Sequence, residues 1–261
     1  MRALSIAATG MLAQQLNVEV ISNNLANMNT TGFKRQRAEF QDLLYQDLAR
    51  QGVNSADEGN IEPSGIQVGV GVKTGAVYRI IEQGDLTQTS NDLDVAVQGR
   101  GMFHVLLPDG TNAYTRAGAF QPGFDGQIVT ADGFVVQPSI TIPQESTSVS
   151  INADGEVMVT IDGQPQAQTV GQLELVTFFN EGGLESRGGN IFLETAASGS
   201  PVTSVPGTPG VGTVIQGFLE TSNVDPVKAI TDLISAQRAY EMNSRVIVTA
   251  DEMMQVNSNL R

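Results

Sequence analysis

Few residues in this chain have the types and spacing that chemistry requires. His104 is the only histidine and lies inside the strand-like run 102–107 (MFHVLL), so we interpret it as structural and not as catalytic or metal-binding. There is no cysteine, which excludes a disulfide framework, thiol catalysis and cysteine-based zinc sites. The phosphate-binding pattern GxxxxGK[ST] does not occur. The sequence therefore predicts no enzyme, no cofactor and no metal site.

Three further motifs are incomplete. Residues 69–71 and 99–101 are GxG, but neither extends to GxGxxG at the start of a helix, so we interpret both as turn or strand-end glycines. Residues 91–94 (NDLD) lack the glycine and distal glutamate of a calcium loop, and we expect a turn that enters a strand. Met253 and Met254 are expected to pack within a helix.

Composition indicates a folded chain with an acidic middle. The 261 residues are 40% apolar and 16% charged, enough for a core in one or two domains and too apolar for disorder. No run of about 18 apolar residues predicts a membrane span, and the N-terminus lacks a cleavable signal pattern. The net charge of −14 divides into +3 over residues 1–37 and −2 over 220–261, which leaves −15 for 38–219. This acidity argues against nucleic acid and anionic lipid as partners.

Both ends of the chain carry heptad patterns. Residues 3–28 predict a helix that Thr30, Thr31 and Gly32 end, with Gly32 as a left-handed cap. Residues 224–261 predict a second helix, capped by Asp225 and started by Pro226. The two lines of the first helix are Leu4, Met11, Val18, Leu25 and Ala7, Gln14, Ile21, Met28; those of the last are Leu233, Tyr240, Ile247, Met254 and Ala236, Asn243, Ala250, Asn257.

These heptad lines contain amides and small residues, so a lone pair of the helices would bury little apolar area. We therefore expect most of their stability to come from packing against more surface, in a chain whose ends associate with each other or with further copies. The alternative is an ordinary two-helix packing within a monomer.

The middle of the chain has the pattern of β structure. Strands are predicted over 74–81, 94–98, 102–107, 127–130, 149–151, 157–161 and 173–179. Asp-Gly pairs, a strong signal for tight turns, begin at Asp109, Asp125, Asp132, Asp154 and Asp162, and the pair at 154–155 predicts a hairpin. We expect a short amphipathic helix within 38–50, an extended excursion over 50–72, and a loop over 196–212.

The fold class expected is α+β: paired, coiled-coil-like terminal helices plus a β-rich middle domain with an extended, hairpin-like connector. Residues 1–32 with 224–261 would form a polymerisation domain. Residues 33–80 would form the connector, with an extended segment at 46–72, and 81–223 an outer β domain.

Both ends also resemble a known family. Residues 6–15 (IAATGMLAQQ), 21–27 (ISNNLAN) and 31–34 (TGFK) resemble the N-terminal signature of bacterial flagellar rod and hook proteins, and 220–224 (ETSNV) with 236–244 (AQRAYEMNS) resemble their C-terminal signature. In the middle, 40–46 (FQDLLYQ), 63–69 (PSGIQVG), 107–111 (LPDGT) and 113–116 (AYTR) are similar to the distal-rod members of that family.

The resemblance implies a structural subunit of the distal rod. Its terminal helices would pack as an inner tube around the export channel, its β domain would face outward, and the segment 46–72 would make the tube stiff. The partners implied are further copies in a helical homo-oligomer, other rod proteins and hook subunits at its ends, the periplasmic and outer-membrane bushing rings, and the flagellar type III export apparatus. The resemblance also implies export without a cleaved signal peptide, and a location in the distal rod, from the periplasm to the outer membrane. It implies no binding to nucleic acid and no direct insertion into a membrane.

The resemblance also assigns residues to roles in assembly. On the first helix these are Leu4, Met11, Gln14, Val18, Ile21, Asn24 and Leu25, and at its exit Asn27, Thr31, Gly32, Phe33 and Lys34. On the last helix they are Leu233, Gln237, Arg238, Tyr240, Asn243, Ile247 and Met254. The stiffening segment contributes Pro63, Ser64, Gly65, Gln67 and Gly69.

Two other readings stay open. A proximal rod or hook subunit of the same family is the near alternative; the segment 46–72 discriminates, because deleting it from a distal-rod subunit should leave a tube that still forms but bends. A β-rich surface binding module is the distant one. It would not need heptad helices at both ends, so removing either end should leave its binding intact.

Overall fold

The computed structural model describes residues 2–49, 65–162 and 166–259, and these form two compact units. The first, here called the helix unit, comprises residues up to 25, residues 36–78 and residues from 226 onward. The second, here called the β domain, comprises residues 26–35 and 79–225. The chain therefore passes from one unit to the other four times, and residues 26–35 belong with the β domain although they directly follow the first helix.

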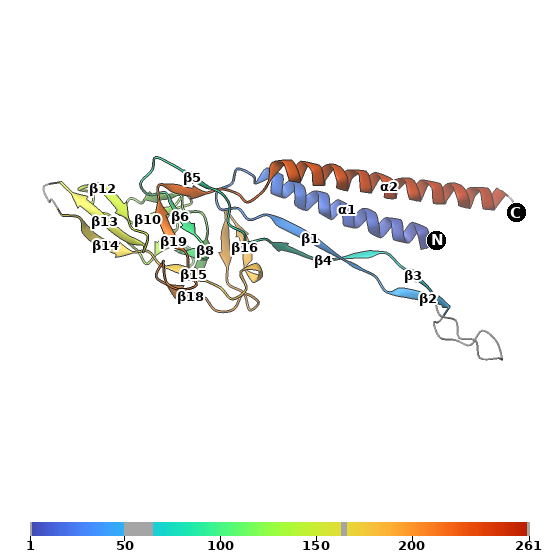
Figure 1. Cartoon of the computed structure of the whole chain (residues 1–261), viewed down its shortest axis with the longest axis horizontal. Coiled ribbons are helices and arrows are strands. Elements are labelled where there is room, and N and C mark those ends of the chain that lie inside the picture. Colours follow the sequence, from blue (N-terminus) through green and yellow to red (C-terminus); the bar gives the residue numbers. More distant parts are fainter. Residues whose placement is uncertain (1, 50–64, 163–165, 260–261) are drawn as a thin grey trace. The chain divides into compact units, whose positions relative to one another are not determined.

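Two long helices, α1 (Arg2–Ala26) and α2 (Pro226–Asn259), confirm the helices predicted at the ends (Figure 1). The helix α2 begins at Pro226 as expected, because the fixed φ of proline suits the first helical position. Their buried side chains are mostly small or β-branched: Ala7, Ala13, Val20 and Ile21 on α1, and Ala229, Ala236 and Ala250 on α2. In the residues described, no helix is both long and apolar enough to cross a membrane.

The rest of the helix unit is a pair of two-stranded ribbons. Strand β1 (Gln36–Asp42) pairs with β4 (Val72–Arg79), and β2 (Tyr45–Ala49) pairs antiparallel with β3 (Ile66–Gly69). The helix predicted within 38–50 is therefore wrong. Leu44 and Leu48, which suggested an apolar helical face, are exposed, while β1 begins with the period-two burial of a strand. Pairing with strands that lie further along the chain, such as Tyr45 with Gly69, overrides the local pattern. Residues 50–64 of the predicted excursion lie outside the described ranges.

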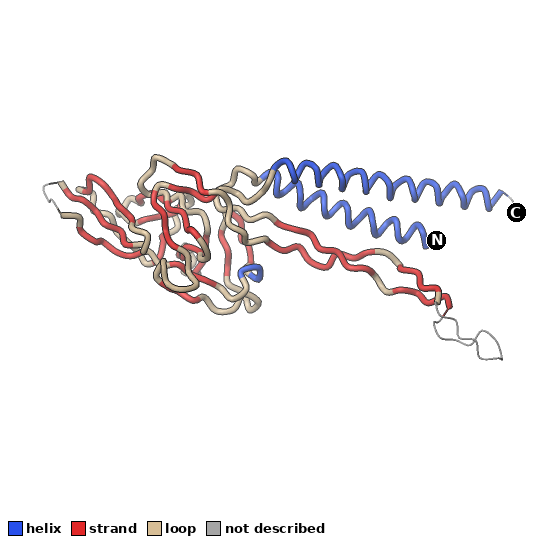
Figure 2. The backbone as a smooth tube through the Cα atoms, in the orientation of Figure 1, coloured by secondary structure: helices blue, strands red, loops and turns tan. Residues whose placement is uncertain are grey.

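The largest sheet of the β domain has nine strands (Figure 2). Its order is β16–β17–β8–β7–β11–β10–β9, and β15 lies beside β7 with β18 beside β15. Neighbouring strands in this sheet pair antiparallel. The strands are β7 (Met102–Leu106), β8 (Asn112–Thr115), β9 (Phe120–Pro122), β10 (Ile128–Thr130), β11 (Val135–Gln137), β15 (Leu175–Thr177), β16 (Glu185–Gly188), β17 (Ile191–Leu193) and β18 (Val202–Ser204).

Smaller sheets complete the β domain. One has the order β12–β13–β14, from Ser146–Ile151, Glu156–Ile161 and Gln168–Gln172. Two pairs join distant segments: β6 (Val95–Gln98) with β19 (Thr213–Gln216), and β5 (Leu86–Gln88) with β20 (Phe218–Glu220). A 3-10 turn, η1, spans Glu181–Gly183. Every strand run predicted from sequence contains a strand, whereas the predicted loop over 196–212 contains β18 and was wrong there.

Four Asp-Gly pairs make the tight turns that the sequence predicts. Gly110, Gly126, Gly133 and Gly155 have φ between +76° and +84°. They connect β7 to β8, β9 to β10, β10 to β11 and β12 to β13, and each pair of strands is antiparallel. The hairpin at 154–155 is thus confirmed, with Ile151 opposite Val157. The turn predicted at Asp162 reaches residues outside the described ranges.

The core lies on both faces of β7, since this strand has neighbours on each edge and cover on each side. Phe103 and Val105 point into a cluster that includes Phe120 and Leu175, while Met102 points into a second cluster. That second cluster also contains Tyr114, Val176, Phe178, Leu184 and Phe192. His104 shares this face and stacks on Tyr114, with ring centroids 5.5 Å apart. It lies in a packed strand, as the sequence predicted.

Candidate functional site

Within the helix unit, α1 contacts both the start of β4 and α2 at Thr9 and Gly10. Thr9 Oγ1 accepts a hydrogen bond from Val72 N at 3.3 Å, and a Cβ added to Gly71 would overlap that same oxygen. A Cβ added to Gly10 would lie 2.9 Å from Asn243 Nδ2 on α2. Two glycines thus let α1 approach the start of β4 on one side and α2 on the other, which explains why small residues stand there.

Asn24 fixes the end of α1 to the start of β1. Its Nδ2 donates to Gln36 O at 2.7 Å, and its Oδ1 accepts from Gln36 N at 2.8 Å. The side chain, which is buried, therefore pairs with one backbone unit as a neighbouring strand would. The amide that the sequence assigned to assembly also makes these contacts within the chain.

Gly32 shapes the segment that leaves α1. Its φ is +70°, its N donates to Glu220 O at 2.8 Å, and a Cβ there would lie 2.9 Å from Ala117 N. The left-handed conformation predicted for Gly32 is present, but its role as the cap of α1 is wrong, because α1 already ends at Ala26. Glycine is needed because the segment passes directly over the backbone of Arg116 and Ala117.

The adjoining lysine enters a buried cluster of three charges, here called the ion clasp: Lys34, Arg116 and Glu220. Lys34 Nζ lies 2.5 Å from Glu220 Oε1, and Arg116 Nε lies 2.5 Å from Glu220 Oε2. All three side chains are at most 6% exposed. One carboxylate thus joins the segment after α1 to β20, close to the start of α2, and to the segment after β8.

Backbone groups satisfy the remaining hydrogen-bonding capacity of the ion clasp. Lys34 Nζ donates to Glu82 O at 2.7 Å, and Gly84 N donates to Glu220 Oε1 at 2.9 Å. Arg116 donates to Val97 O at 2.9 Å and Gly99 O at 2.6 Å, and also to Gly101 O. Buried charges persist only where they are paired and hydrogen-bonded, so each member depends on the others.

Asn223 reinforces the same junction. Its Oδ1 accepts from Arg35 N at 2.7 Å, and its Nδ2 donates to Ile80 O and Glu82 O at 2.9 and 3.0 Å. Asn190 adds a further link, donating from Nδ2 to Thr31 O at 2.7 Å. The β domain thereby holds the segments after α1, after β4 and before α2 together.

The ion clasp predicts that the β domain loses stability as the pH falls. Burial alone would raise the pKa of Glu220, but Arg116 and Lys34 outweigh it and hold that pKa below 4.5, its ordinary value. A depressed folded-state pKa means that the stabilisation is present above the unfolded-state pKa and is lost as the pH falls through the folded one.

We therefore expect the free energy of unfolding of the wild-type chain to fall more steeply below about pH 4.5 than that of a Glu220→Gln variant, which cannot titrate there. Urea unfolding at a series of pH values, followed by near-ultraviolet circular dichroism, measures this. Parallel slopes for the two proteins would contradict it.

The structure places the four sets of residues predicted from sequence as follows. On α1, Ile21 and Asn24 are buried and Leu4, Met11, Gln14, Val18 and Leu25 are half-buried. On α2, Leu233, Asn243 and Ile247 are half-buried, and Gln237, Arg238, Tyr240 and Met254 are exposed. The exit residues Thr31, Gly32, Phe33 and Lys34 come together in the β domain, as does Asn27. Gly65 precedes β3, Gln67 and Gly69 lie in it, and Pro63 and Ser64 fall outside the described residues.

Sequence reasoning missed the functional side chains Arg116, Asn190, Glu220 and Asn223. Three of them stood inside motifs recognised from sequence, 113–116 and 220–224, without a role of their own. For Arg116 and Glu220 the available signal was a charged residue next to a strand pattern, which requires an opposite charge elsewhere in the chain.

Two long terminal helices joined through a β domain define the class of axial proteins of the flagellar rod and hook, and family models agree. The model described as "Flagella basal body rod protein" matches residues 4–34, the "Flagellar hook protein FlgE/F/G D1 domain" matches 96–159, and the "Flagellar basal body rod FlgEFG protein C-terminal" matches 215–260. The segments matched thus include both helices and the first half of the large sheet.

Whole-length relatives give the particular family. The chain is 62% identical to the flagellar basal-body rod protein FlgG of Caulobacter vibrioides and 53% identical to that of Agrobacterium fabrum, in each case over 100% of both chains. It is 49% identical to that of Buchnera aphidicola over 99% of both. The chain belongs to the family of flagellar basal-body rod protein FlgG. It is accordingly a structural subunit of the flagellar distal rod, located in the basal body, and not an enzyme.

Proposed function

We propose that the chain assembles with further copies into a stiff helical tube, which transmits torque and surrounds the export channel. In this proposal the helices α1 and α2 pair in coiled-coil fashion and pack against those of neighbouring copies. The β domain faces outward, toward the bushing rings. Other rod proteins and hook subunits join the ends of the tube, and the subunit arrives through the type III export apparatus without losing a signal peptide.

The observation that carries the proposal is the exposed apolar surface of α2. In the described part of this helix the buried apolar side chains are three alanines, whereas ten large apolar side chains are exposed. These are Val227, Ile230, Ile234, Tyr240, Met242, Val246, Val248, Met253, Met254 and Val256. A helix that exposes so many apolar groups is stabilised by packing against additional surface, at about 25 cal/mol per Å² buried.

The ribbons of the helix unit support the same conclusion. Leu44, Tyr45, Leu48 and Ile66 are exposed on β2 and β3 or next to them. A two-stranded hairpin is only marginally stable alone, so these strands gain stability from a neighbouring copy. We propose that the segment 46–72 braces adjacent subunits in this way and makes the tube stiff.

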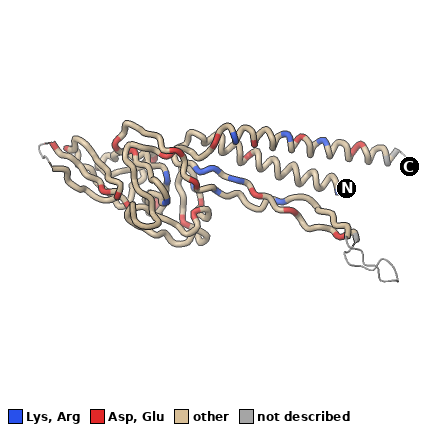
Figure 3. The backbone as a smooth tube through the Cα atoms, viewed as in Figure 1, with Lys and Arg blue, Asp and Glu red and all other residues tan. Residues whose placement is uncertain are grey.

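The acidic surface of the β domain would help the tube to rotate inside a surrounding ring. Acidic residues are spread over the strands and turns of the β domain, with fewer basic ones between them (Figure 3). A like-charged, hydrated outer surface would resist adhesion to a surrounding ring. An assembled tube whose outward face is neutral or apolar would refute this part of the proposal.

Electron microscopy of the purified chain tests the proposal directly. As the concentration rises, we expect tubes to appear together with a gain in helical circular dichroism, because the exposed helices become ordered as they pack. A chain deleted for residues 46–72 should still form tubes, but flexible ones. A fully helical monomer at low concentration that never polymerises would instead show that the helices pack only within one chain.

A further inference from the structure

We infer that the β domains of successive copies join head to tail, with Phe179 of one copy inserted into a hollow at the far end of the next. This inference rests on the proposed self-assembly and names the contact within it. Both surfaces belong to the β domain, and each has a feature that one copy alone leaves unsatisfied.

The first surface is an exposed aromatic side chain next to a hydrogen-bonded backbone. Phe179 follows β15 and is 98% exposed, whereas its neighbour Phe178 is buried against Tyr114. The backbone on its far side is fixed, because Asn180 N donates to Ser198 O at 3.2 Å and Asn180 Nδ2 to Ala197 O at 3.1 Å. The ring therefore projects into solvent from an ordered backbone, so that its insertion costs side-chain entropy but little backbone entropy.

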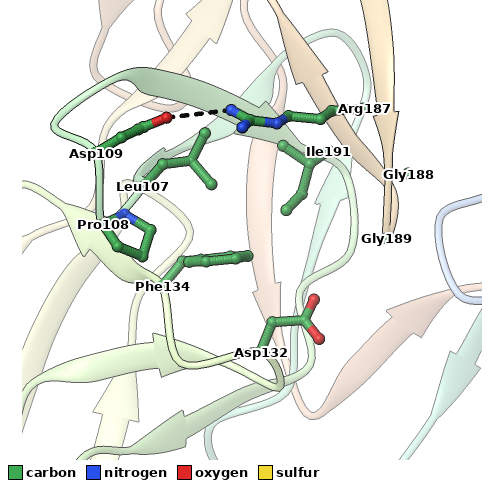
Figure 4. Close-up of a pocket in the computed structure, with 9 residues that line it drawn as sticks. All are labelled: Leu107, Pro108, Asp109, Asp132, Phe134, Arg187, Gly188, Gly189 and Ile191. Carbon is green, nitrogen blue, oxygen red and sulfur yellow. Dashed lines mark hydrogen bonds and ion pairs between the residues drawn. The ribbon is translucent and has the colours of Figure 1, made fainter.

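The second surface is a hollow of about 530 Å³, large enough for an aromatic ring. Leu107, Pro108, Phe134 and Ile191 supply apolar walls, and Arg187 and Asp132 stand at its rim (Figure 4). Its lining is completed by Asp109, Gly188 and Gly189.

The charges that flank the two surfaces are complementary. Beside Phe179 stand Arg100 and Glu181, 3.1 Å apart, and the Arg100 side chain is 64% exposed. At the hollow, Arg187 is paired with Asp109 at 3.3 Å, and among the described residues Asp132 has no ion-pair partner. With Phe179 in the hollow, the exposed Arg100 would face Asp132, whereas Glu181 is only 14% exposed and keeps its pairing with Arg100. The exposed cation beside the ring and the Asp132 carboxylate beside the hollow favour a second copy as the occupant.

The two surfaces lie at opposite ends of β7, which decides the kind of contact. Val176 of β15 pairs with Met102 at the start of β7, and the chain continues past that end to Phe179. The hollow residues 107–109 follow directly after the end of β7, and 132–134 precede Val135, which pairs with Leu106. Because the ring and the hollow are at opposite ends, one copy can offer its ring to one neighbour and its hollow to another. We therefore take the contact to be heterologous and to repeat from copy to copy along an assembly, whereas a reciprocal two-fold pair would stop at a dimer.

Because the chain lacks cysteine, cross-linking can test the contact cleanly. Ala131→Cys lies beside the hollow and Gly182→Cys beside Phe179, where an added Cβ finds no atom closer than 3.5 Å. With the full chain at assembling concentration and a short bis-maleimide, the double variant should give a ladder of dimers, trimers and longer species. Each single variant should stop at dimers.

Second-site changes give the result its specificity. Phe179→Ser in the double-cysteine background should reduce the ladder at least about tenfold, or about 1.4 kcal/mol, because the buried area of the phenylalanine ring is lost. Asp132→Arg should also reduce it. Phe124→Ser is the matched control, because Phe124 is 93% exposed but lies on another turn; it should leave the ladder unchanged.

The inference is overturned by a wild-type chain that polymerises while the double variant gives no species beyond dimers, an outcome that leaves the proposed function standing. It is also overturned by a ladder that Phe179→Ser leaves intact, by one that Phe124→Ser reduces equally, or by cross-linking to a different flagellar protein. Failure of the wild-type chain to assemble at all would remove the proposed function and this contact together. Circular dichroism confirms that each variant is folded.

Discussion

Replacing Glu220 by glutamine is expected to lower the free energy of unfolding of the β domain by about 3–5 kcal/mol, because it leaves two buried cations without their anion. Lys34 and Arg116 both depend on that carboxylate and are nearly inaccessible to water. Urea unfolding of the full chain, followed by near-ultraviolet circular dichroism, reports the packing of Tyr114 in the β domain.

The chain offers a matched control for this variant. Glu82 pairs with Arg35 at 2.8 Å, but the carboxylate side chain is 69% exposed and Arg35 is 31% exposed, so Glu82→Gln should cost less than about 1 kcal/mol. Lys34→Met combined with Glu220→Gln should destabilise less than the sum of the two single changes, since the members of one network are not additive. Equal effects of Glu82→Gln and Glu220→Gln would show that the ion clasp does not stabilise the fold.

Replacing Gly71 by alanine is expected to raise the critical concentration for assembly at least about tenfold, which corresponds to about 1.4 kcal/mol. Two costs combine. The φ of Gly71 is +126°, a conformation that a residue with a Cβ rarely adopts, and the new methyl group would overlap Thr9 Oγ1. The contact between α1 and the start of β4 would separate. Sedimentation of polymer at a series of concentrations measures the change.

Two companion variants separate these costs. Thr9→Ala combined with Gly71→Ala removes the overlapping oxygen and should recover part of the loss, leaving the strain at φ. Gly75→Ala, in the same ribbon, meets only the flexible side chain of Gln41 and should assemble almost normally. An assembly defect in Gly75→Ala as large as that in Gly71→Ala would contradict the assignment of a specific contact at Thr9.

The parts of the fold with short-range signals were predictable. Seven-residue repeats gave both helices, Pro226 gave the start of α2, and Asp-Gly pairs gave four antiparallel turns. Local signals failed where distant partners decide. The spacing of Phe40, Leu43, Leu44 and Leu48 suits a helix, yet the segment forms strands because it pairs with strands further along the chain. A glycine in the sequence can serve as a helix cap or allow two backbone segments to pass closely. The sequence does not distinguish these roles, so Gly32 was wrongly assigned as a cap.

The ion clasp illustrates the same limit within the candidate site. Lys34 and Glu220 are 186 positions apart, and Arg116 and Glu220 are 104 apart. No local spacing associates them, although each is conspicuous as a charge next to apolar segments. Only the tertiary arrangement shows that the three charges compensate one another. The exposed faces of α1 and α2 are a different case from the ion clasp. Their role in assembly was expected from the sequence, and their contacts in an assembled tube are part of the proposal.

The members of the ion clasp are far apart along the chain, and this separation also affects when the β domain can fold. In a chain that leaves the proposed export apparatus N-terminus first, Lys34 and Arg116 would emerge before Glu220 and stay solvated until it follows. Emergence of Glu220, with 41 residues still to come, and not the appearance of the first strands, would therefore allow the β domain to close.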